Sequence, residues 1–311
     1  MPYRSDVRDP SRLPTAARDA ILAWYRRHGR SLPFRKSSDP YAVLVSEAMA
    51  QQTQAARAGD AWVGFMERFP TTHALAAASA ADVLRAWRGL GYNRRALNLQ
   101  RAARQLVERH DGRVPADLES LLALPGVGPY TARAVAAIAF GQPTGAVDTN
   151  VRRVLGRILA SDAATMPAAD LQRVADEAVP IGQAADWTHA LMDVGAMFCR
   201  PRRPLCEACP ARAWCRFAKG ARPGPADPPT TEARRPSVAF ASTSRWLRGR
   251  IVDRLRSAPD GAWIRIRGPI GKHDEAAVST ALAALAVEGF IELDQRPTEA
   301  GPGQRARLST S

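Results

Sequence analysis

All four cysteines of the chain lie in one short segment, CRPRRPLCEACPARAWC, which spans residues 199–215. Their spacing, through Cys199, Cys206, Cys209 and Cys215, is C-x6-C-x2-C-x5-C. Four thiolates suit either a tetrahedral zinc ion or a [4Fe-4S] cluster, and the ligand type alone does not separate the two. Structural zinc sites usually pair two short C-x2-4-C units, and this segment has only one. The spacing therefore favours a [4Fe-4S] cluster held by these four cysteines.

A basic loop, RPRRPL, joins the first two cysteines. It contains Arg200, Arg202 and Arg203, and it is stiffened by Pro201 and Pro204. A fixed group of guanidinium ions suits the phosphates of a nucleic-acid backbone. We therefore predict that the three arginines bind DNA, with a merely solvated basic loop as the alternative.

A glycine turn between two helical segments lies upstream, in LPGVGPYTARAVAAIAFGQPTGAVDTNVRRVL. Glycines in such a turn allow positive φ, and the next helix directs free backbone N–H groups at a phosphate. The predicted DNA-binding residues of this turn are Leu124, Gly126, Val127 and Gly128. Asp148 follows twenty residues after Gly128, before another helix start, and this combination is far more specific than a glycine turn alone.

The hairpin, VDTNVRRVL, the cysteine spacing and the upstream segment SEAMAQQTQ together resemble the helix-hairpin-helix DNA glycosylase superfamily. More narrowly, they resemble its iron–sulfur branch, which includes endonuclease III and the adenine DNA glycosylases of the MutY type. The resemblance covers about residues 15–220 and implies a mostly α fold, with a six-helix barrel and an iron–sulfur cluster domain. It also implies a [4Fe-4S] cofactor and double-stranded DNA with a mismatched or damaged base pair as the partner.

The resemblance implies catalytic roles for three residues. Endonuclease III carries a nucleophilic lysine two positions after the last hairpin glycine, where this chain has Tyr130, and none of its lysines falls between positions 37 and 218. A monofunctional enzyme is therefore expected, one that releases the base without cutting the strand. Glu47 would protonate the leaving purine, and Asp148 would stabilise the positive charge on the sugar. The structural alternatives are a solvated helix face for Glu47 and a helix N-cap for Asp148.

The same resemblance implies residues that contact or replace the extruded base. Gln51, Gln52 and Tyr92 would fill the stack when the target base leaves the duplex, although Tyr92 could equally be a core aromatic residue. Three positions depart from the usual adenine pocket: Phe34 in LPFR stands where Trp is common, Ala50 replaces a larger apolar residue, and His189 stands where Glu or Gln is frequent. Arg35 is retained, and His189 could also be a core histidine.

Successive amphipathic helices with short Gly/Pro turns extend from about residue 15 to 220. A Pro/Gly-rich linker follows, and then a small α+β module with the order helix, strand, helix, strand, which is winged-helix-like. We expect its tail, RPTEAGPGQRARLSTS, to form a wing and a frayed end. The predicted domains are an N-terminal helix at 10–37, the six-helix barrel with the hairpin at 38–148, the iron–sulfur domain at 149–220, the linker at 221–243 and the module at 244–311.

The chain carries a formal net charge of +14 at pH 7, which favours a polyanionic partner such as nucleic acid. Its N-terminus lacks the apolar core of a signal peptide, and no apolar run is long enough to span a bilayer. We therefore expect a cytoplasmic, nucleoid-associated protein without a membrane partner, a monomer, and reduced rather than disulfide-bonded cysteines.

Three functions remain open from the sequence. The first is a monofunctional glycosylase of base excision repair that removes adenine opposite 8-oxoguanine or guanine. The second is a sibling enzyme that removes thymine or uracil opposite guanine, since Tyr130 and Asp148 suit both. The third is a non-catalytic iron–sulfur DNA-binding protein, which has no need of the Glu47 and Asp148 pair. Many adenine glycosylases recognise 8-oxoguanine with a Nudix-like domain, and the tail here, about 70 residues, is too short for one.

Overall fold

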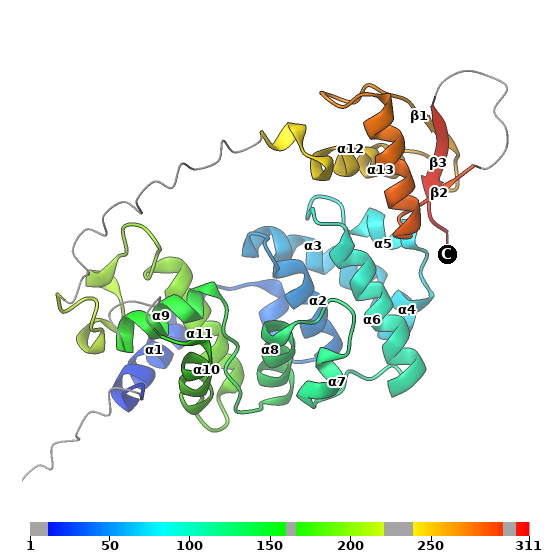
Figure 1. The fold of residues 1–311 in the computed structure, drawn as a ribbon. Coiled ribbons are helices and arrows are strands. Elements are labelled where there is room, and N and C mark those ends of the chain that lie inside the picture. Colours follow the sequence, from blue (N-terminus) through cyan, green and yellow to red (C-terminus); the bar gives the residue numbers. More distant parts are fainter. Residues whose placement is uncertain (1–11, 160–165, 221–238, 295–302, 311) are drawn as a thin grey trace, which may run out of the picture. The chain divides into compact units, whose positions relative to one another are not determined.

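The computed structural model describes residues 12–159, 166–220, 239–294 and 303–310. The chain divides into two compact units, of which unit 1 contains residues 1–47 and 114–231 and unit 2 contains residues 48–113 and 232–311. Both are built mainly of helices, which confirms the mostly α prediction (Figure 1). No helix among the described residues is long and apolar enough to cross a membrane. The units group the chain differently from the predicted domains, whose boundaries stay a prediction.

Unit 1 joins the N-terminal residues to the helices of the central third of the chain. Its elements are α1 (Thr15–His28), the short turn η1 (Pro33–Lys36), most of α2 (Pro40–Ala50), α7 (Leu118–Leu122), α8 (Pro129–Phe140), α9 (Thr149–Leu159), α10 (Ala168–Glu177) and α11 (Ala184–Met197), followed by the turns η3 (Cys206–Ala208) and η4 (Arg212–Trp214) of the cysteine segment.

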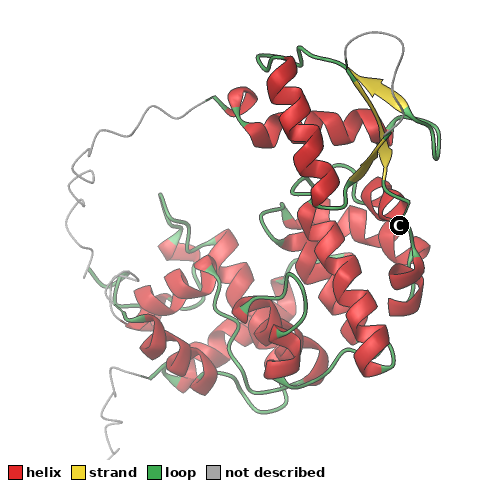
Figure 2. Ribbon diagram, turned by 45° about the vertical axis from the view of Figure 1, so that its right-hand side comes forward, coloured by secondary structure: helices red, strands yellow, loops and turns green. Residues whose placement is uncertain are grey.

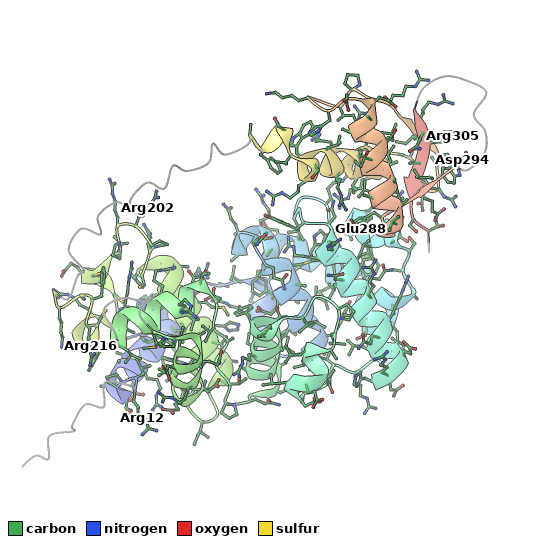
Figure 3. All side chains as sticks on the ribbon, viewed as in Figure 1. Arg12, Arg202, Arg216, Glu288, Asp294 and Arg305 are labelled. Atoms are coloured by element: carbon green, nitrogen blue, oxygen red, sulfur yellow. The ribbon has the colours of Figure 1, made fainter. Side chains whose placement is uncertain are left out.

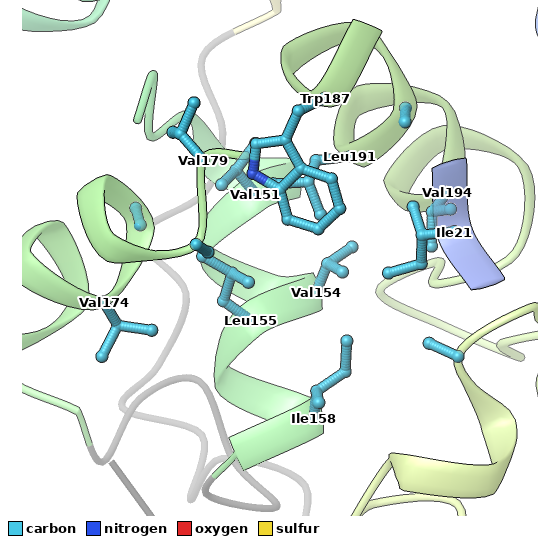
Figure 4. Packing of buried hydrophobic residues seen from close by; sticks show 14 of the residues in the cluster. Ile21, Val151, Val154, Leu155, Ile158, Val174, Val179, Trp187, Leu191 and Val194 are labelled. Atoms are coloured by element: carbon cyan, nitrogen blue, oxygen red, sulfur yellow. The ribbon is translucent and has the colours of Figure 1, made fainter. Parts of the chain in front are cut away.

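The core of unit 1 is centred on Trp187 of α11, which is 1% exposed (Figure 4). α9 presents Val151, Val154, Leu155 and Ile158 to this core. Their spacing of three and four residues places all four side chains on one face of the helix. This packing fixes the position of α9, whose first turn follows Asp148.

Unit 2 contains α3 (Ala55–Arg68), α4 (Thr72–Ala77), α5 (Ala80–Ala86) and α6 (Arg94–His110). Phe65 packs edge-to-face against Phe69 and Trp87. Side chains cap two of the short helices, because Thr71 and Ser79 accept hydrogen bonds from the backbone of the first turns of α4 and α5.

The C-terminal module belongs to unit 2 and consists of η5 (Phe240–Ser242), α12 (Ser244–Arg256), β1 (Ile264–Ile266), α13 (Glu275–Val287), β2 (Ile291–Leu293) and β3 (Gln304–Leu308). The strands form an antiparallel sheet in the order β1-β3-β2 (Figure 2). The small α+β module is thus confirmed, but the expected frayed end is wrong: residues 304–308 form the central strand, and Ala306 pairs with both Ile264 and Leu293. Most of the predicted linker, and residues 296–302 of the predicted tail, lie outside the described residues.

The module is attached to the helices of unit 2 by polar contacts. Glu288, at the end of α13 (Figure 3), forms an ion pair of 3.0 Å with Arg94 of α6. Its backbone carbonyl accepts a hydrogen bond of 2.7 Å from Arg101 of the same helix. The backbone N–H of Ala81, in α5, donates to the carbonyl of Ser309 at 2.8 Å. The module therefore packs directly on α5 and α6.

Candidate active site

Glu47 lies near the end of α2 and is 7% exposed, so the alternative of a solvated helix face is wrong. Burial raises the pKa of its carboxyl group to about 7, because a charged carboxylate loses its hydration there. A hydrogen bond with Tyr130 and the positive charge of Arg35 lower the pKa, whereas the negative charge of Asp148 raises it. Glu47 is therefore a carboxyl group that can hold a proton near neutral pH.

Asp148 forms the N-cap of α9. Its Oδ1 accepts a hydrogen bond of 2.7 Å from the backbone N–H of Val151, and its Oδ2 accepts one of 2.8 Å from Nδ2 of Asn150. The alternative of an N-cap is thus observed, and the capped side chain lies within electrostatic reach of Glu47. Both side-chain oxygens of Asp148 thus accept hydrogen bonds, which hold the carboxyl group in place.

Tyr130 occupies the first turn of α8, in place of the lysine that a lyase mechanism would use. Its hydroxyl group is hydrogen-bonded with Glu47 and lies 3.8 Å from the sulfur of Met192. Burial, together with the charges of Glu47 and Asp148, raises its pKa well above the usual value. Tyr130 therefore stays a neutral hydroxyl group that can donate a proton in a hydrogen bond to Glu47.

Arg35 forms a buried ion pair with Asp193, which was not predicted from the sequence. Nη1 and Nη2 of Arg35 each donate to Asp193 at 2.8 Å, and Arg30 adds contacts from its backbone N–H (2.9 Å) and its Nε (2.7 Å). The Asp193 side chain is fully buried, and its pKa lies below the usual value because these donors outweigh its burial. An aspartate in the otherwise apolar stretch ALMDVGAM was the available signal.

His189 lies one helical turn before Asp193 and is buried. Burial lowers its pKa to about 3, and the positive charges of Arg35 and Arg30 lower it further against the opposing effect of Asp193. Its ring lies 6.3 Å from that of Tyr25. His189 is therefore neutral at physiological pH. Phe34 is half-buried in η1, immediately before Arg35.

The hairpin turn has the expected position between α7 and α8. Gly126 has a φ of 81°, as predicted, and the N–H of Val127 donates to the carbonyl of Leu124 at 3.1 Å. The expectation of positive φ is wrong at Gly128, which has a φ of −97° because it is the extended N-cap of α8. Pro129 then begins the helix, at a position whose N–H has no partner within a helix.

The cysteines are all free, and Cys215 is buried whereas the other three are half-buried. Burial raises the pKa of Cys209 to about 12, and the other three cysteines raise it further, so the four thiols lie within electrostatic reach of one another. No three His, Cys, Asp or Glu side chains in the described ranges converge on a single metal ion. In a [4Fe-4S] cluster each cysteine binds a different iron, so four thiols in one segment remain a fitting donor set.

Two arginines of α9 hold the cysteine segment. Arg153 donates through Nε to the carbonyl of Cys199 and through Nη2 to Oδ1 of Asn150 at 2.7 Å. Nη1 of Arg157 lies 3.6 Å from the sulfur of Cys199. Through Arg153, helix α9 therefore connects Cys199 with Asn150, which donates a hydrogen bond to Asp148.

The predicted phosphate-binding arginines Arg200, Arg202 and Arg203 are all exposed, and Figure 3 shows the side chain of Arg202 pointing outward from its loop. Arg203 has a φ of 51°, in the left-handed region. The loop thus presents its charges to solvent, as a phosphate-binding loop must.

The remaining predicted residues belong to unit 2 and are described within it. Ala50 and Gln51 are half-buried, and Gln52 is exposed with a φ of 53°. Tyr92 is 46% exposed, so the alternative of a core aromatic residue is wrong. Arg95 was not predicted from the sequence, and its guanidinium group donates to the backbone carbonyls of Gln51 and of Gly91, just before Tyr92.

Comparisons with known proteins agree with this geometry. The family model described as "HhH-GPD superfamily base excision DNA repair protein" matches residues 45–177. The adenine DNA glycosylase of Mycobacterium tuberculosis is 40% identical over 285 residues, which are 88% of this chain and 92% of that protein.

Two solved structures each cover 65% of this chain. A thermostable thymine-DNA glycosylase superposes with a TM-score of 0.61 and 30% identity, over 94% of that chain. A non-covalent endonuclease III–DNA complex superposes with a TM-score of 0.57 and 26% identity, over 93% of that chain.

The chain therefore belongs to the HhH-GPD superfamily of base excision DNA repair proteins. Within that family it is an enzyme, a DNA glycosylase. The predicted resemblance and fold class are both confirmed, and the non-catalytic alternative falls away.

Proposed function

We propose that the enzyme is a monofunctional glycosylase that hydrolyses the N-glycosidic bond of adenine mispaired with 8-oxoguanine or guanine. The observation that carries this proposal is the raised pKa of Glu47, about 7, beside the hydrogen-bonded carboxylate of Asp148. Two carboxyl groups whose environments differ in this way can act as acid and anion at one site. Support also comes from the M. tuberculosis relative, which is an adenine DNA glycosylase.

The proposed mechanism uses each group in the form that its surroundings favour. The protonated carboxyl group of Glu47 donates to a ring nitrogen of the extruded adenine, so the base leaves as a neutral molecule. The C–N bond breaks with its electron pair moving to the base, and the Asp148 carboxylate stabilises the positive charge that develops on the sugar. Water then adds to C1′ and loses a proton, leaving an abasic site. Tyr130, which lacks an amine, orients Glu47 and forms no Schiff base.

Thymine or uracil opposite guanine is the second candidate, because the thermostable thymine-DNA glycosylase shares the fold at 30% identity. A pyrimidine departs as an anion that hydrogen bonds can stabilise, so it has less need of a proton donor with a pKa near 7. The chemistry of Glu47 therefore favours adenine. The neutral His189 and half-buried Phe34 are the proposed pocket residues that set this choice, together with Arg35 and Ala50.

The DNA contacts belong to the same proposal. The hairpin residues Leu124, Gly126, Val127 and Gly128, together with Arg200, Arg202 and Arg203, would bind backbone phosphates, and Gln51, Gln52 and Tyr92 would fill the space left by the extruded base. Exposure of the three arginines and of Tyr92 supports these roles. We also propose that the enzyme acts as a monomer, which sedimentation would test.

Cys199, Cys206, Cys209 and Cys215 would hold a [4Fe-4S] cluster, which supplies a rigid support for the basic loop rather than a reacting group. Iron and sulfide content with visible absorption would establish it, and a colourless zinc protein would contradict it. Cys206→Ser should lower solubility and DNA affinity before it changes the rate of base excision. Loss of the whole cluster with undiminished DNA binding would refute the supporting role.

The test of function is single-turnover excision from duplexes that carry A opposite 8-oxoguanine, A opposite G, T opposite G or U opposite G, each developed with and without alkali. We expect cleavage of the adenine strands only, and only after alkali. Release of thymine or uracil instead would overturn the substrate, and cleavage without alkali would overturn the monofunctional mechanism.

Asp148→Asn keeps a side chain that caps helices well, so α9 should remain folded. We expect excision to fall by about a hundredfold or more, because the negative charge is lost. Asp117 provides the matched control, since it caps α7 by accepting from the N–H of Ser120 at 2.8 Å. Asp117→Asn should excise at the normal rate, and retained turnover in Asp148→Asn would refute the catalytic assignment.

A further inference from the structure

Tyr92 lies in a turn whose backbone is unusual. Gly89, Gly91 and Tyr92 have φ values of 87°, 67° and 46°. Positive φ is common for glycine but rare for a bulky aromatic residue, and such conformations persist where the surrounding structure holds them. The ring is nevertheless 46% exposed. The contacts that hold this exposed side chain therefore decide which orientation it presents to DNA.

Arg95 holds the turn from within the helical part of unit 2. Its guanidinium group donates to the carbonyls of Leu90 (3.0 Å) and Gly91 (3.3 Å), and also to those of Met49 (3.1 Å) and Gln51. The two segments that are proposed to enter the DNA stack, around Gln51 and around Tyr92, are thus joined through one side chain. These bonds fix the backbone, and the guanidinium carbon of Arg95 also lies 5.7 Å from the centre of the Tyr92 ring. They do not hold the phenol hydroxyl group.

The C-terminal module adds a contact with that hydroxyl group from α12. Nη1 of Arg245 donates to the hydroxyl oxygen of Tyr92 at 3.0 Å, and the guanidinium carbon lies 5.2 Å from the centre of the Tyr92 ring. The same guanidinium lies 5.2 Å from the ring of Phe240. Arg245 therefore contacts two exposed aromatic rings, one from the module and one from the turn, in the range of cation–π attraction.

A second arginine of α12 fixes the neighbouring residue. Nη2 of Arg256 donates to Oδ1 of Asn93 at 2.7 Å, while its Nη1 contacts Asp253 at 3.1 Å. Arg256 is buried, so this contact belongs to the interior of the interface between the module and α6. It anchors α12 at the turn and thereby places Arg245 over Tyr92.

We propose that Arg245 is a positioning residue for base extrusion: from the C-terminal module, it holds Tyr92 in the orientation in which Tyr92 enters the DNA stack. An exposed tyrosine without this contact would sample several rotamers and would pay the entropy of ordering during extrusion. Arg245 removes that cost before DNA binds. Through Arg245, the module thus contributes to opening the duplex. The inference rests on the proposed function, since it requires that Tyr92 act on an extruded base.

The test compares Arg245→Met with a matched control, Arg254→Met, which removes the same charge from an exposed position of the same helix. Extrusion is followed by the fluorescence of 2-aminopurine at the target position opposite 8-oxoguanine, with Glu47→Gln present in every protein to prevent excision. We expect Arg245→Met to lower the extrusion equilibrium about tenfold, which corresponds to about 1.4 kcal/mol. Arg254→Met should match its parent, and Arg245→Lys, which keeps the charge but not the planar group, should retain most of the defect.

A coupling cycle separates positioning from general destabilisation. Excision of adenine opposite 8-oxoguanine is measured for Arg245→Met, Tyr92→Ala and the double variant, all with Glu47 intact. If Arg245 acts through Tyr92, the double variant is no slower than Tyr92→Ala alone, whereas independent effects multiply. The pH profile of Arg245→Met should keep the parent's shape, because Glu47 is untouched.

Two results would overturn the inference: extrusion by Arg245→Met equal to that of Arg254→Met, or effects that multiply in the double variant. Both would leave the proposed function standing as long as the unmodified enzyme excises adenine. If the unmodified enzyme releases no adenine from any duplex, the proposed function itself fails.

Discussion

Glu47 gives the sharpest prediction, because its raised pKa has opposite consequences for stability and for activity. Its folded pKa is about 7, against an ordinary value of 4.5 that we assign to the unfolded chain. Below pH 4.5 the carboxyl group is protonated in both states and costs nothing. Between pH 4.5 and pH 7 the unfolded chain releases this proton while the folded protein keeps it, so stability falls as the pH rises, and above pH 7 the loss is complete. The difference between the two values corresponds to about 3 kcal/mol of unfolding free energy at pH 8 and above.

Glu47→Gln removes this penalty, because a neutral amide occupies the same place at every pH. We expect the variant to unfold at a higher urea concentration than the parent at pH 8, with an advantage of up to about 3 kcal/mol. The advantage over the parent should diminish steadily between pH 7 and pH 5. Urea unfolding of both proteins across this range measures the effect. A stability difference that does not change with pH would refute the reasoning, as would one that grows on acidification.

The same proton decides the rate. The value of kcat/KM reports groups of the free enzyme, so it should follow the protonated fraction of Glu47 and fall about tenfold between pH 6 and pH 8. Below pH 6 Glu47 is almost fully protonated, so its titration should not change kcat/KM further. Glu47→Gln should lose excision altogether while it gains stability. A rate that rises from pH 6 to pH 8 would show that Glu47 acts as a base, and the proposed proton donation would be wrong.

Two further substitutions test the support of the site. Asp193→Asn leaves the buried guanidinium of Arg35 without its counter-ion and should cost about 3 kcal/mol or more in urea unfolding, so a loss below about 1 kcal/mol would contradict the pairing. Gly195→Ala would place a Cβ 2.5 Å from that of Asn150, whose side chain donates a hydrogen bond to Asp148, so we expect a loss of about 1–3 kcal/mol and slower excision. Gly249→Ala, in a helix with open space at that position, is the control and should be neutral or stabilising by up to about 1 kcal/mol.

Local patterns made much of this protein predictable. The helical periodicity of residues 15–220 depends on neighbours three and four positions apart, and the stripe on α9 is read directly from that spacing. Asp148 was found because a carboxylate before a helix start is itself a local pattern. Even β3 had a local signal, since Ala306 and Leu308 alternate with polar residues. However, a segment of only five residues that directly follows a Gly-Pro-Gly run resembles a frayed end as closely as a strand.

Interactions between distant residues were not predictable in this way. Arg35 and Asp193 are 158 positions apart, and Tyr92 and Arg245 are 153 apart. The sequence around each residue does not indicate its partner, because an arginine is as common on a solvent-exposed helix face as in an ion pair or an aromatic contact. The raised pKa of Glu47 likewise follows from the burial of its carboxyl group, which depends on how α2 packs in the fold.

The two carboxyl groups show why structural and functional readings of a residue need not exclude each other. Asp148 caps α9, and the two hydrogen bonds of that cap also fix the position of its carboxyl group. Burial disfavours the charge of Glu47, and the neighbouring Asp148 disfavours it further. The negative charge of Asp148 thus adds to the effect of burial on the pKa of the proposed proton donor. A sequence position that looks like an ordinary helix cap can therefore also contribute to the raised pKa of a neighbouring acid.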